Sequence, residues 1–471
     1  MDLRQGWTEC ARIARPAHRA RLWDHRRRCS VSSNPTMEKL ADQIIDWARK
    51  EGASEVAVDL AKSRFIELER RDGQLEKIRE ASSAGLNLAL YVDGRYSSHS
   101  TNDMRPEALE AFVKRAVPMT RLLSVDPFQG LAEPVLYEGR SDVDLQILDS
   151  KHSDVTPEAR QAIATQVEEG ARSVKADIIS VTSGYYDSFN ENLKVHSNGF
   201  SGYEESSDFW CGADVSVNDP SGKKPSGWDW VGSRTFDALP SPFASGVEST
   251  KRATSRIGQT QLPSGTMTVV LENRIAGGLL RHLLRAAQGA ALQQKQSFLL
   301  DKLDQKLGSE VFTLIDDPLK VKGFASKHFD RDGISAKARN LIEAGVLRSF
   351  LIDVYYGRKL GVTPTGGGTS NLVVPPGKRS FDELLADIPS GVFVTSLLGG
   401  NSDTTRGDFS HGISGFAIEN GTLGAPIGEM NIAGNHTTFW NQLVEVGNDP
   451  YLYTSTLTPT LVFEGVSVSG A

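Results

Sequence analysis

The sequence has 471 residues, 39% of them hydrophobic, and its 52 basic and 59 acidic side chains give a net charge of −7. A chain of this size buries a large core and is expected to form two or three domains. It contains no run of about 18 apolar residues and no apolar stretch typical of a secretory signal, so the sequence predicts a cytoplasmic protein that does not enter a membrane.

The positive charge is concentrated at the start of the chain. Residues 1–36 contain eight arginines and three acidic residues, whereas the other 435 residues carry 44 basic and 56 acidic groups. A body with a balance of −12 repels the phosphate backbone of nucleic acids, so we expect no nucleic-acid partner. The arginine-rich stretch is expected to be a disordered extension or the product of a start codon chosen too early. An organellar transit peptide is the alternative.

The first predicted segment, 37–125, is an α/β unit built around two hairpins. A helix over 36–51 presents one apolar face and ends before a glycine. Asp-Gly steps at 72–73 and 93–94 separate runs of alternating apolar and polar residues, which is a strong hairpin signal. A second helix near 105–121 closes the segment.

The middle segment, 145–255, is predicted to combine a helix with strands. It follows a stretch from 122 to 144 that contains proline, glycine and acidic residues and has no sustained period, as is typical of a linker. An amphipathic helix is expected from 156 to about 175. A strand pair with an Asn-Gly turn at 198–199 comes after it.

The C-terminal segment, 262–471, is glycine-rich and expected to be mainly β. It has one long helix within 271–298 and a short acidic helix near 380–387. Its strand signals are runs rich in β-branched and aromatic residues, at 266–271, 390–398, 412–421 and 461–470. Together the three segments predict the α+β class.

Three stretches of this last segment resemble a known family. Successive blocks of the TldD/PmbA family, also called modulators of DNA gyrase, are similar to 263–309 with its AGGLLRHLLRAAQGAALQQKQSF, to 338–372 with its TPTGGGTSNL, and to 407–435 with its GDFSHGISGFAIENG. The resemblance extends over about residues 37–471. It implies a cytoplasmic two-subunit metallopeptidase, in which a TldD-type subunit holds zinc and a PmbA-type subunit, also called TldE, pairs with it and lacks the metal.

The resemblance also indicates the subunit type. TldD-type subunits carry His-Glu-x-x-x-His on this same helix and a later cysteine as a third ligand. Such a grouping holds zinc and leaves one position open for a water molecule, whose pKa falls to about 7. Here His282 is followed by Leu283, none of the nine histidines precedes a glutamate, and no cysteine follows Cys211. The chain therefore resembles the PmbA/TldE type, with no cofactor of its own and zinc in a TldD-like partner.

His282 and Gly289 are the candidate functional residues of the helix. A lone histidine among leucines is usually a core or interface residue with one nitrogen hydrogen-bonded, and the alternative is metal ligation or acid–base catalysis. Gly289 belongs to a patch of small residues that would let another backbone approach closely. We expect it to contact substrate or partner.

A glycine-rich loop offers a second set of candidates, Gly366, Gly367, Gly368 and Asn371. The run lacks the lysine and the spacing of a phosphate-binding loop, so turn geometry is the first interpretation. The alternative is that these residues contact an extended peptide or a loop of a partner.

A third set, His411, Asp408 and Glu429, combines oxygen and nitrogen atoms that could form a non-standard metal site. Solvated loop residues are the first interpretation of this group.

Two classes of function follow from these observations. In the first, the chain is the metal-free subunit of a metallopeptidase and binds peptide or unfolded protein as an added strand along a sheet edge, while the zinc-bearing partner hydrolyses it. In the second, the chain is a peptidase in its own right with a non-standard metal site. A direct protein modulator of DNA gyrase is a further alternative.

Overall fold

The computed structural model describes residues 34–470, and its first element is the predicted N-terminal helix. Helix α1 (Pro35–Lys50) starts after Asn34, whose side chain accepts a hydrogen bond from the backbone N–H of Met37 at 3.2 Å. Asparagine here satisfies one of the N–H groups that a helix leaves unpaired in its first turn. Residues 34–36, predicted as the end of the extension, therefore belong to the helix and its cap. The rest of that extension lies outside the described residues.

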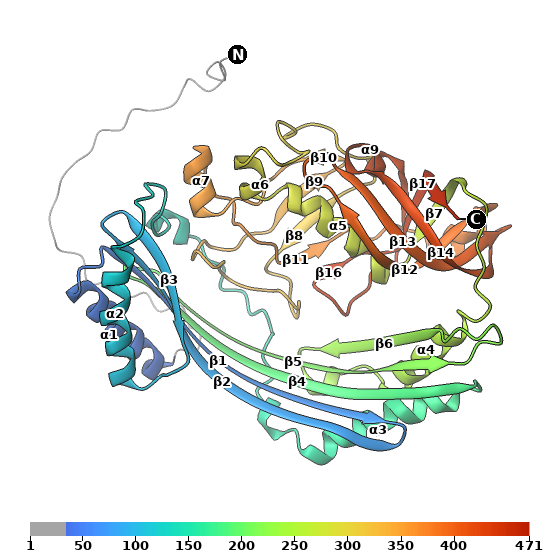
Figure 1. Cartoon of the computed structure of the whole chain (residues 1–471), viewed down its shortest axis with the longest axis horizontal. Coiled ribbons are helices and arrows are strands. Elements are labelled where there is room, and N and C mark those ends of the chain that lie inside the picture. The colour runs from blue at the N-terminus through green and yellow to red at the C-terminus, as the bar shows by residue number, and fades with distance from the viewer. Residues whose placement is uncertain (1–33, 471) are drawn as a thin grey trace. The chain divides into compact units, whose positions relative to one another are not determined.

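Six antiparallel strands form the first sheet, which joins the first two predicted segments. Their order is β3-β2-β1-β4-β5-β6, so β1 of the N-terminal segment pairs along its length with β4 of the middle segment (Figure 1). The strands are β1 (Glu55–Arg71), β2 (Gln74–Val92), β3 (Arg95–Thr101), β4 (Ile178–His196), β5 (Ser201–Val217) and β6 (Ser226–Ser233).

Both predicted Asp-Gly hairpins are confirmed. Asp72 and Gly73 have φ values of 49° and 84°, and Asp93 and Gly94 have φ values of 48° and 72°. Two consecutive positive φ values are typical of the type I′ turn, whose twist matches that of paired strands. These turns connect β1 to β2 and β2 to β3, and the turn expected at 198–199 separates β4 from β5.

The strands are longer than the sequence patterns indicate, and one sheet serves two cores. Strand β1 has 17 residues and runs without a break through two apolar stretches. Val56, Val58 and Leu60 belong to one core, and Leu68 belongs to another. The first core is covered by α1 and α2 (Pro106–Thr120), and the second by α3 (Pro157–Ser173) and α4 (Pro242–Thr254).

From β7 onward the chain builds two further sheets, which confirms the α+β class. A six-stranded sheet has the order β14-β13-β12-β7-β17-β15, and a five-stranded sheet has the order β10-β9-β8-β11-β16. The strands are β7 (Gly265–Leu271), β8 (Leu314–Asp317), β9 (Arg339–Glu343), β10 (Val346–Leu347), β11 (Asn371–Val373), β12 (Ser390–Ser402), β13 (Asp408–Glu419), β14 (Thr422–Asn435), β15 (Leu443–Val446), β16 (Thr456–Leu457) and β17 (Leu461–Ser469).

The long helix expected within 271–298 is interrupted. Helix α5 spans Asn273–Ala286, and α6 resumes only over Gly289–Gln293. The N–H of Gly289 donates to the carbonyl of Leu351 at 2.9 Å, next to a β-bridge between Gln288 and Leu351. Because this N–H bonds to another segment, the α5 ladder of hydrogen bonds cannot continue through it. The other helices of this segment are short: α7 (Val354–Leu360), α8 (Phe381–Ala386) and α9 (His436–Phe439).

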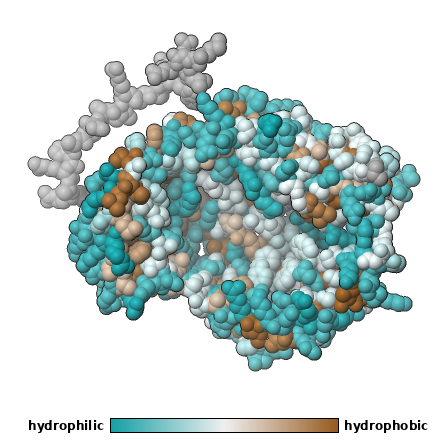
Figure 2. Space-filling model, in the orientation of Figure 1, coloured by the Kyte–Doolittle hydropathy of each residue, from teal (hydrophilic) through white to brown (hydrophobic). Residues whose placement is uncertain are grey.

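The apolar face of α5 belongs to the largest core of the described chain. Leu279, Leu280 and Leu283 are buried there together with Val269 of β7 and Val392 of β12. Among residues 34–470, no helix combines the length and apolar character that a membrane span requires. Figure 2 shows mostly hydrophilic residues on the drawn face, with small separate hydrophobic patches between them.

Candidate functional site

The structure brings His282 of α5 against His411 of β13. Their ring centroids are 5.1 Å apart and the ring planes meet at 37°. Nδ1 of His411 lies 3.1 Å from the carbonyl oxygen of Gly399, which assigns the ring proton to Nδ1 and leaves Nε2 with a lone pair. That Nε2 atom and Nδ1 of His282 are both buried and have no hydrogen-bond partner among the described residues.

A third histidine, His436, lies close to the pair, but both of its ring nitrogens have hydrogen-bond partners. The indole N–H of Trp440 donates to its Nδ1 at 3.2 Å, and its Nε2 lies 3.3 Å from the hydroxyl of Ser402. The ring stacks on Phe298 with centroids 5.5 Å apart. Burial lowers the pKa of His436 to about 3, so this imidazole is neutral at physiological pH.

The donors around His282 do not fit a zinc centre. Burial lowers the pKa of His282, and so do the nearby His411, Arg285 and Arg281 in that order. The pair therefore offers two imidazole nitrogens beside two guanidinium groups, whereas catalytic zinc uses three protein ligands and a water molecule. Within the described part of the chain, no group of three or more histidine, cysteine or acidic side chains could hold a metal ion.

The other two members of the third candidate set lie away from His411. Asp408 is exposed and accepts a hydrogen bond from the side-chain amide of Asn435 at 2.8 Å. Glu429 is exposed and pairs with Lys223 at 2.8 Å. His411 itself is 4% exposed. The structure thus separates the three residues that the sequence placed in one possible metal site.

The carbonyl groups of the glycine-rich loop face the guanidinium of Arg339. Nη2 of Arg339 lies 3.4 Å from the carbonyl oxygen of Gly366 and 3.0 Å from that of Gly368, and it also pairs with Asp316 at 3.0 Å. A phosphate-binding loop presents N–H groups instead. Gly366 has φ of +92°, and a Cβ added to Gly367 would lie 2.6 Å from Cβ of Asp353. Both glycines are therefore explained by local geometry.

Asn371 and Gly289 make their closest contacts inside this chain. Asn371 is fully buried, accepts from the N–H of Ala325 at 2.9 Å, and donates to the hydroxyl of Ser326 at 2.8 Å. A Cβ added to Gly289 would lie 2.7 Å from Cβ of Tyr356 in α7. The close backbone approach inferred from the small residues thus occurs between α6 and α7.

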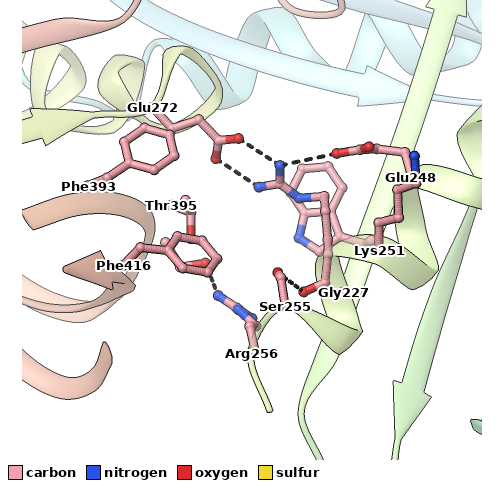
Figure 3. A pocket seen from close by; sticks show the side chains of 12 residues that line it. Gly227, Glu248, Lys251, Ser255, Arg256, Glu272, Phe393, Thr395 and Phe416 are labelled. Atoms are coloured by element: carbon pink, nitrogen blue, oxygen red, sulfur yellow. Dashed lines mark hydrogen bonds and ion pairs between the residues drawn. The ribbon is translucent and has the colours of Figure 1, made fainter. Parts of the chain in front are cut away.

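A cavity of about 230 Å³ combines elements that the sequence analysis did not connect. Arg252 of α4 forms two hydrogen bonds to the carboxylate of Glu272, at 2.6 and 2.8 Å, and Glu272 is the residue directly before α5 (Figure 3). Phe393 of β12 and Phe416 of β13 form the opposite wall. The full lining is Gly227, Trp228, Glu248, Lys251, Arg252, Ser255, Arg256, Glu272, Phe393, Thr395, Ser396 and Phe416.

The sequence analysis missed this cavity because it did not identify α4. One usable signal was present: Arg252 and Arg256 are four residues apart, the spacing of neighbours on one side of a helix, although Arg256 lies two residues beyond the end of α4. The partners Glu272, Phe393 and Phe416 are distant in sequence, so no local pattern links them to the arginines.

A second cavity, of about 360 Å³, lies where the first sheet meets α7 and the loop before it. Its charged groups are paired: Lys194 with Asp59 at 3.0 Å, and Arg331 with Asp353 at 2.7 Å. Burial raises the pKa of Asp332, which also lines this cavity. Paired charges leave little net attraction for an ionic ligand.

Comparisons with known proteins agree with this architecture. Models of the PmbA/TldA metallopeptidases match the chain with their domain 1 at residues 56–119, their central domain at 150–257 and their C-terminal domain at 264–470. Metalloprotease PmbA of Escherichia coli O157:H7 is 30% identical over 432 residues, which cover 89% of this chain and 94% of that protein.

Solved structures show the same fold over nearly the whole chain. A candidate modulator of DNA gyrase from Bacteroides thetaiotaomicron has a TM-score of 0.90 and 38% identity, covering 93% of this chain and all of its own. TldE from Thermococcus kodakarensis has a TM-score of 0.80 and 21% identity, covering 92% of this chain and all of its own, and it shares the fold. The three domain matches and the relative in Escherichia coli together establish the relationship: the chain belongs to the PmbA/TldD family of metallopeptidases.

Proposed function

We propose that this chain is the metal-free, PmbA/TldE-type subunit of a TldD/PmbA-type metallopeptidase in the cytoplasm. A TldD-like partner holds the zinc ion and performs hydrolysis, and this chain binds peptide or unfolded protein and completes the enzyme. The observation that carries the proposal is the donor set at α5, where His282 is followed by Leu283 and lies near Arg281 and Arg285.

The electrostatics of α5 support this assignment. Zinc carries two positive charges, and two neighbouring guanidinium groups repel it at short range. Anionic ligands would offset this repulsion, but Asp408 and Glu429, the acidic members of the third candidate set, are exposed and bonded elsewhere. The similarity in fold to TldE supports the same subunit type.

Strand addition is the mode of substrate binding that the first sheet favours. β3 and β6 are its edge strands, and an extended peptide can bind to a sheet edge through main-chain hydrogen bonds. Main-chain recognition tolerates varied side chains, as binding of peptides or unfolded proteins requires. The body of the chain is acidic, which disfavours nucleic acid as a partner.

One observation favours a second candidate function, a peptidase that acts without a partner. Nδ1 of His282 and Nε2 of His411 are buried, lack partners among the described residues and belong to rings in contact. Free imidazole nitrogens of this kind can bind a metal or transfer a proton. Analysis of the isolated chain distinguishes the two functions.

The deciding experiment purifies the chain alone and together with a TldD-like protein from the same genome. Zinc is measured in each preparation after dialysis, and peptidase activity is assayed on unfolded casein. We expect zinc in the partner only, and activity only when both chains are present. One zinc per chain in the isolated protein, lost in His282→Ala, would instead identify the second function.

A further inference from the structure

We propose that the cavity between α4 and the β12–β13 strands binds the C-terminal carboxylate of a peptide whose last residue is apolar. This inference rests on the proposed function, because it specifies which part of a peptide substrate this chain recognises. The cavity has Lys251 and Arg252 on the α4 side and the rings of Phe393 and Phe416 on the strand side, and Arg256 lies between them, bonded to Ser396 and Ser414 (Figure 3).

The positive charges of the cavity are only partly neutralised. Arg252 is paired with Glu272 at 2.6 Å and with Glu248 at 3.7 Å. Lys251 and Arg256 also line the cavity, and no carboxylate of residues 34–470 lies within ion-pair distance of either side chain. The cavity therefore keeps an excess of positive charge that favours an anion.

Arg256 keeps donors for a ligand. Its guanidinium donates to the carbonyl of Ser226 at 3.0 Å, to the hydroxyl of Ser414 at 2.9 Å and to the hydroxyl of Ser396. A guanidinium has five N–H groups, so these three contacts leave the Nε–H and one N–H of Nη1, each of which can donate to an oxygen of an anionic ligand. The hydroxyl of Ser396 also lines the cavity and has a proton to donate.

The environment of Arg256 makes an anionic ligand favourable. Its acceptors in this chain are neutral oxygens, and burial followed by the neighbouring Arg252 lowers its pKa. A charge removed from water without a counter-ion is costly, and an incoming carboxylate would offset that cost through charge-assisted hydrogen bonds.

The opposite wall fits an apolar side chain. The rings of Phe393 and Phe416 stack with centroids 6.4 Å apart, and Trp228 of β6 lines the cavity with 46% of its surface exposed. A volume of about 230 Å³ holds a terminal residue and not a folded partner. Inorganic phosphate would use only the cationic wall, so the aromatic wall favours a peptide end.

The test measures binding of the peptide Ala-Ala-Ala-Phe, with either a free carboxylate or a carboxamide, to the full chain by calorimetry. We expect the acid to bind at least about tenfold more tightly than the amide, since charge-assisted hydrogen bonds are roughly twice as strong as neutral ones. Arg256→Gln should abolish this preference, and Arg256→Lys should retain part of it. Arg105→Gln, at an exposed arginine directly before α2, is the matched control and should leave binding unchanged.

A second variant, Lys251→Gln, tests the inference if Arg256→Gln does not fold. Lys251 is exposed and has no ion pair within the described chain, so Lys251→Gln should fold normally and weaken binding of the acid several-fold. Equal binding of acid and amide would overturn the inference. So would inorganic phosphate that binds as tightly as the acid, because the aromatic wall would then contribute nothing.

Failure of this inference can be told apart from failure of the proposed function. If acid and amide bind equally but the two-chain mixture still cleaves casein, only the carboxylate site is wrong. If the acid is preferred and Arg256→Gln removes the preference, the site is supported even when the mixture shows no peptidase activity. In that case the subunit role is the wrong part.

Discussion

At the scale of single residues, burial decides what the histidines can do. His436 is fully buried between Phe298 and Trp440, and His196 is 4% exposed. Burial disfavours the charged imidazolium and lowers the pKa of each to about 3. His282 is only half-buried, and its pKa is lowered in the same direction. All three are neutral at physiological pH and differ in their hydrogen bonds.

The buried histidines predict a loss of stability in acid. Above pH ~6.5, His436 and His196 are neutral in both the folded and the unfolded chain and contribute nothing. As the pH falls below that value, the unfolded chain takes up protons that the folded chain cannot take up until about pH 3. Each residue should then lower the free energy of unfolding by about 1.4 kcal/mol per pH unit.

Urea unfolding at pH 7, 6 and 5 checks this prediction. His436→Gln keeps an acceptor for Trp440 and a donor for Ser402 but cannot be protonated. It should reduce the slope of the unfolding free energy against pH by about 1.4 kcal/mol per pH unit, which corresponds to one proton. His152→Gln, at a histidine nearer the surface, is the control. An unchanged slope in His436→Gln would show that this imidazole titrates normally in the folded chain.

His282→Gln separates a structural from a chemical role for the histidine of α5. Glutamine keeps a hydrogen-bonding nitrogen and removes basicity, so the unfolding free energy should fall by about 1 kcal/mol or less. Peptidase activity of the two-chain mixture should persist. A stable His282→Gln chain that abolishes activity of the mixture would mean that this chain contributes chemistry from α5.

At the scale of elements, a contact between short helices determines where the α5 helix ends. Gly289 opens α6 directly against Tyr356 of α7, and its N–H bonds to Leu351 instead of continuing α5. Helix propensity alone would have extended the helix through the alanines at 286, 287, 290 and 291. The hydrogen bond and β-bridge to the distant residue Leu351 override that local preference.

Gly289→Glu should disrupt this contact. The new Cβ would lie 2.7 Å from Cβ of Tyr356, and the carboxylate would be buried without a partner, which costs several kcal/mol. We expect a large loss of stability by thermal unfolding and a loss of activity in the two-chain mixture. Gly368→Glu, where no atom lies within 4 Å of the added Cβ, is the control and should be tolerated. Equal stability of the two variants would contradict the packing.

At the scale of the whole molecule, side-chain pairs join the first sheet and its helix α4 to the start of α5. Arg252 of α4 holds Glu272 at the start of α5, and Arg274 of α5 pairs with Asp229 of β6 at 2.5 Å. These four residues are partly or fully buried, and removing one partner would leave a buried charge unpaired.

The start of the described chain gives a prediction about truncation. Asn34 caps α1 and its side-chain amide donates to Glu191 of β4 at 2.5 Å. Deletion of residues 1–33 should leave the unfolding free energy unchanged, because the arginine-rich stretch has no apolar period with which to join a core. Deletion of 1–36 removes the cap and should cost about 1 kcal/mol.

Urea unfolding of the two truncated chains and of full-length Asn34→Ala checks the truncation prediction. The Asn34→Ala chain should match the longer deletion. A comparable loss on deletion of 1–33 would show that the leading stretch packs against the rest of the chain.

The sequence by itself determined the local features. The Asp-Gly turns at 72–73 and 93–94, the amphipathic α1 and the α+β class depend on neighbouring residues, whose periods and backbone preferences are readable in the chain. The family was recognisable for the same reason, because its motifs are continuous stretches within 263–435.

Only the tertiary structure decided which distant residues meet. Pairing of β1 with β4 joins positions more than a hundred residues apart, and His282 lies 129 positions from His411. The cavity of Arg256 likewise takes its walls from α4, β12 and β13. Such contacts arise from the burial of apolar faces and the pairing of charges across the fold, and these leave no spacing in the sequence that a local pattern could reveal.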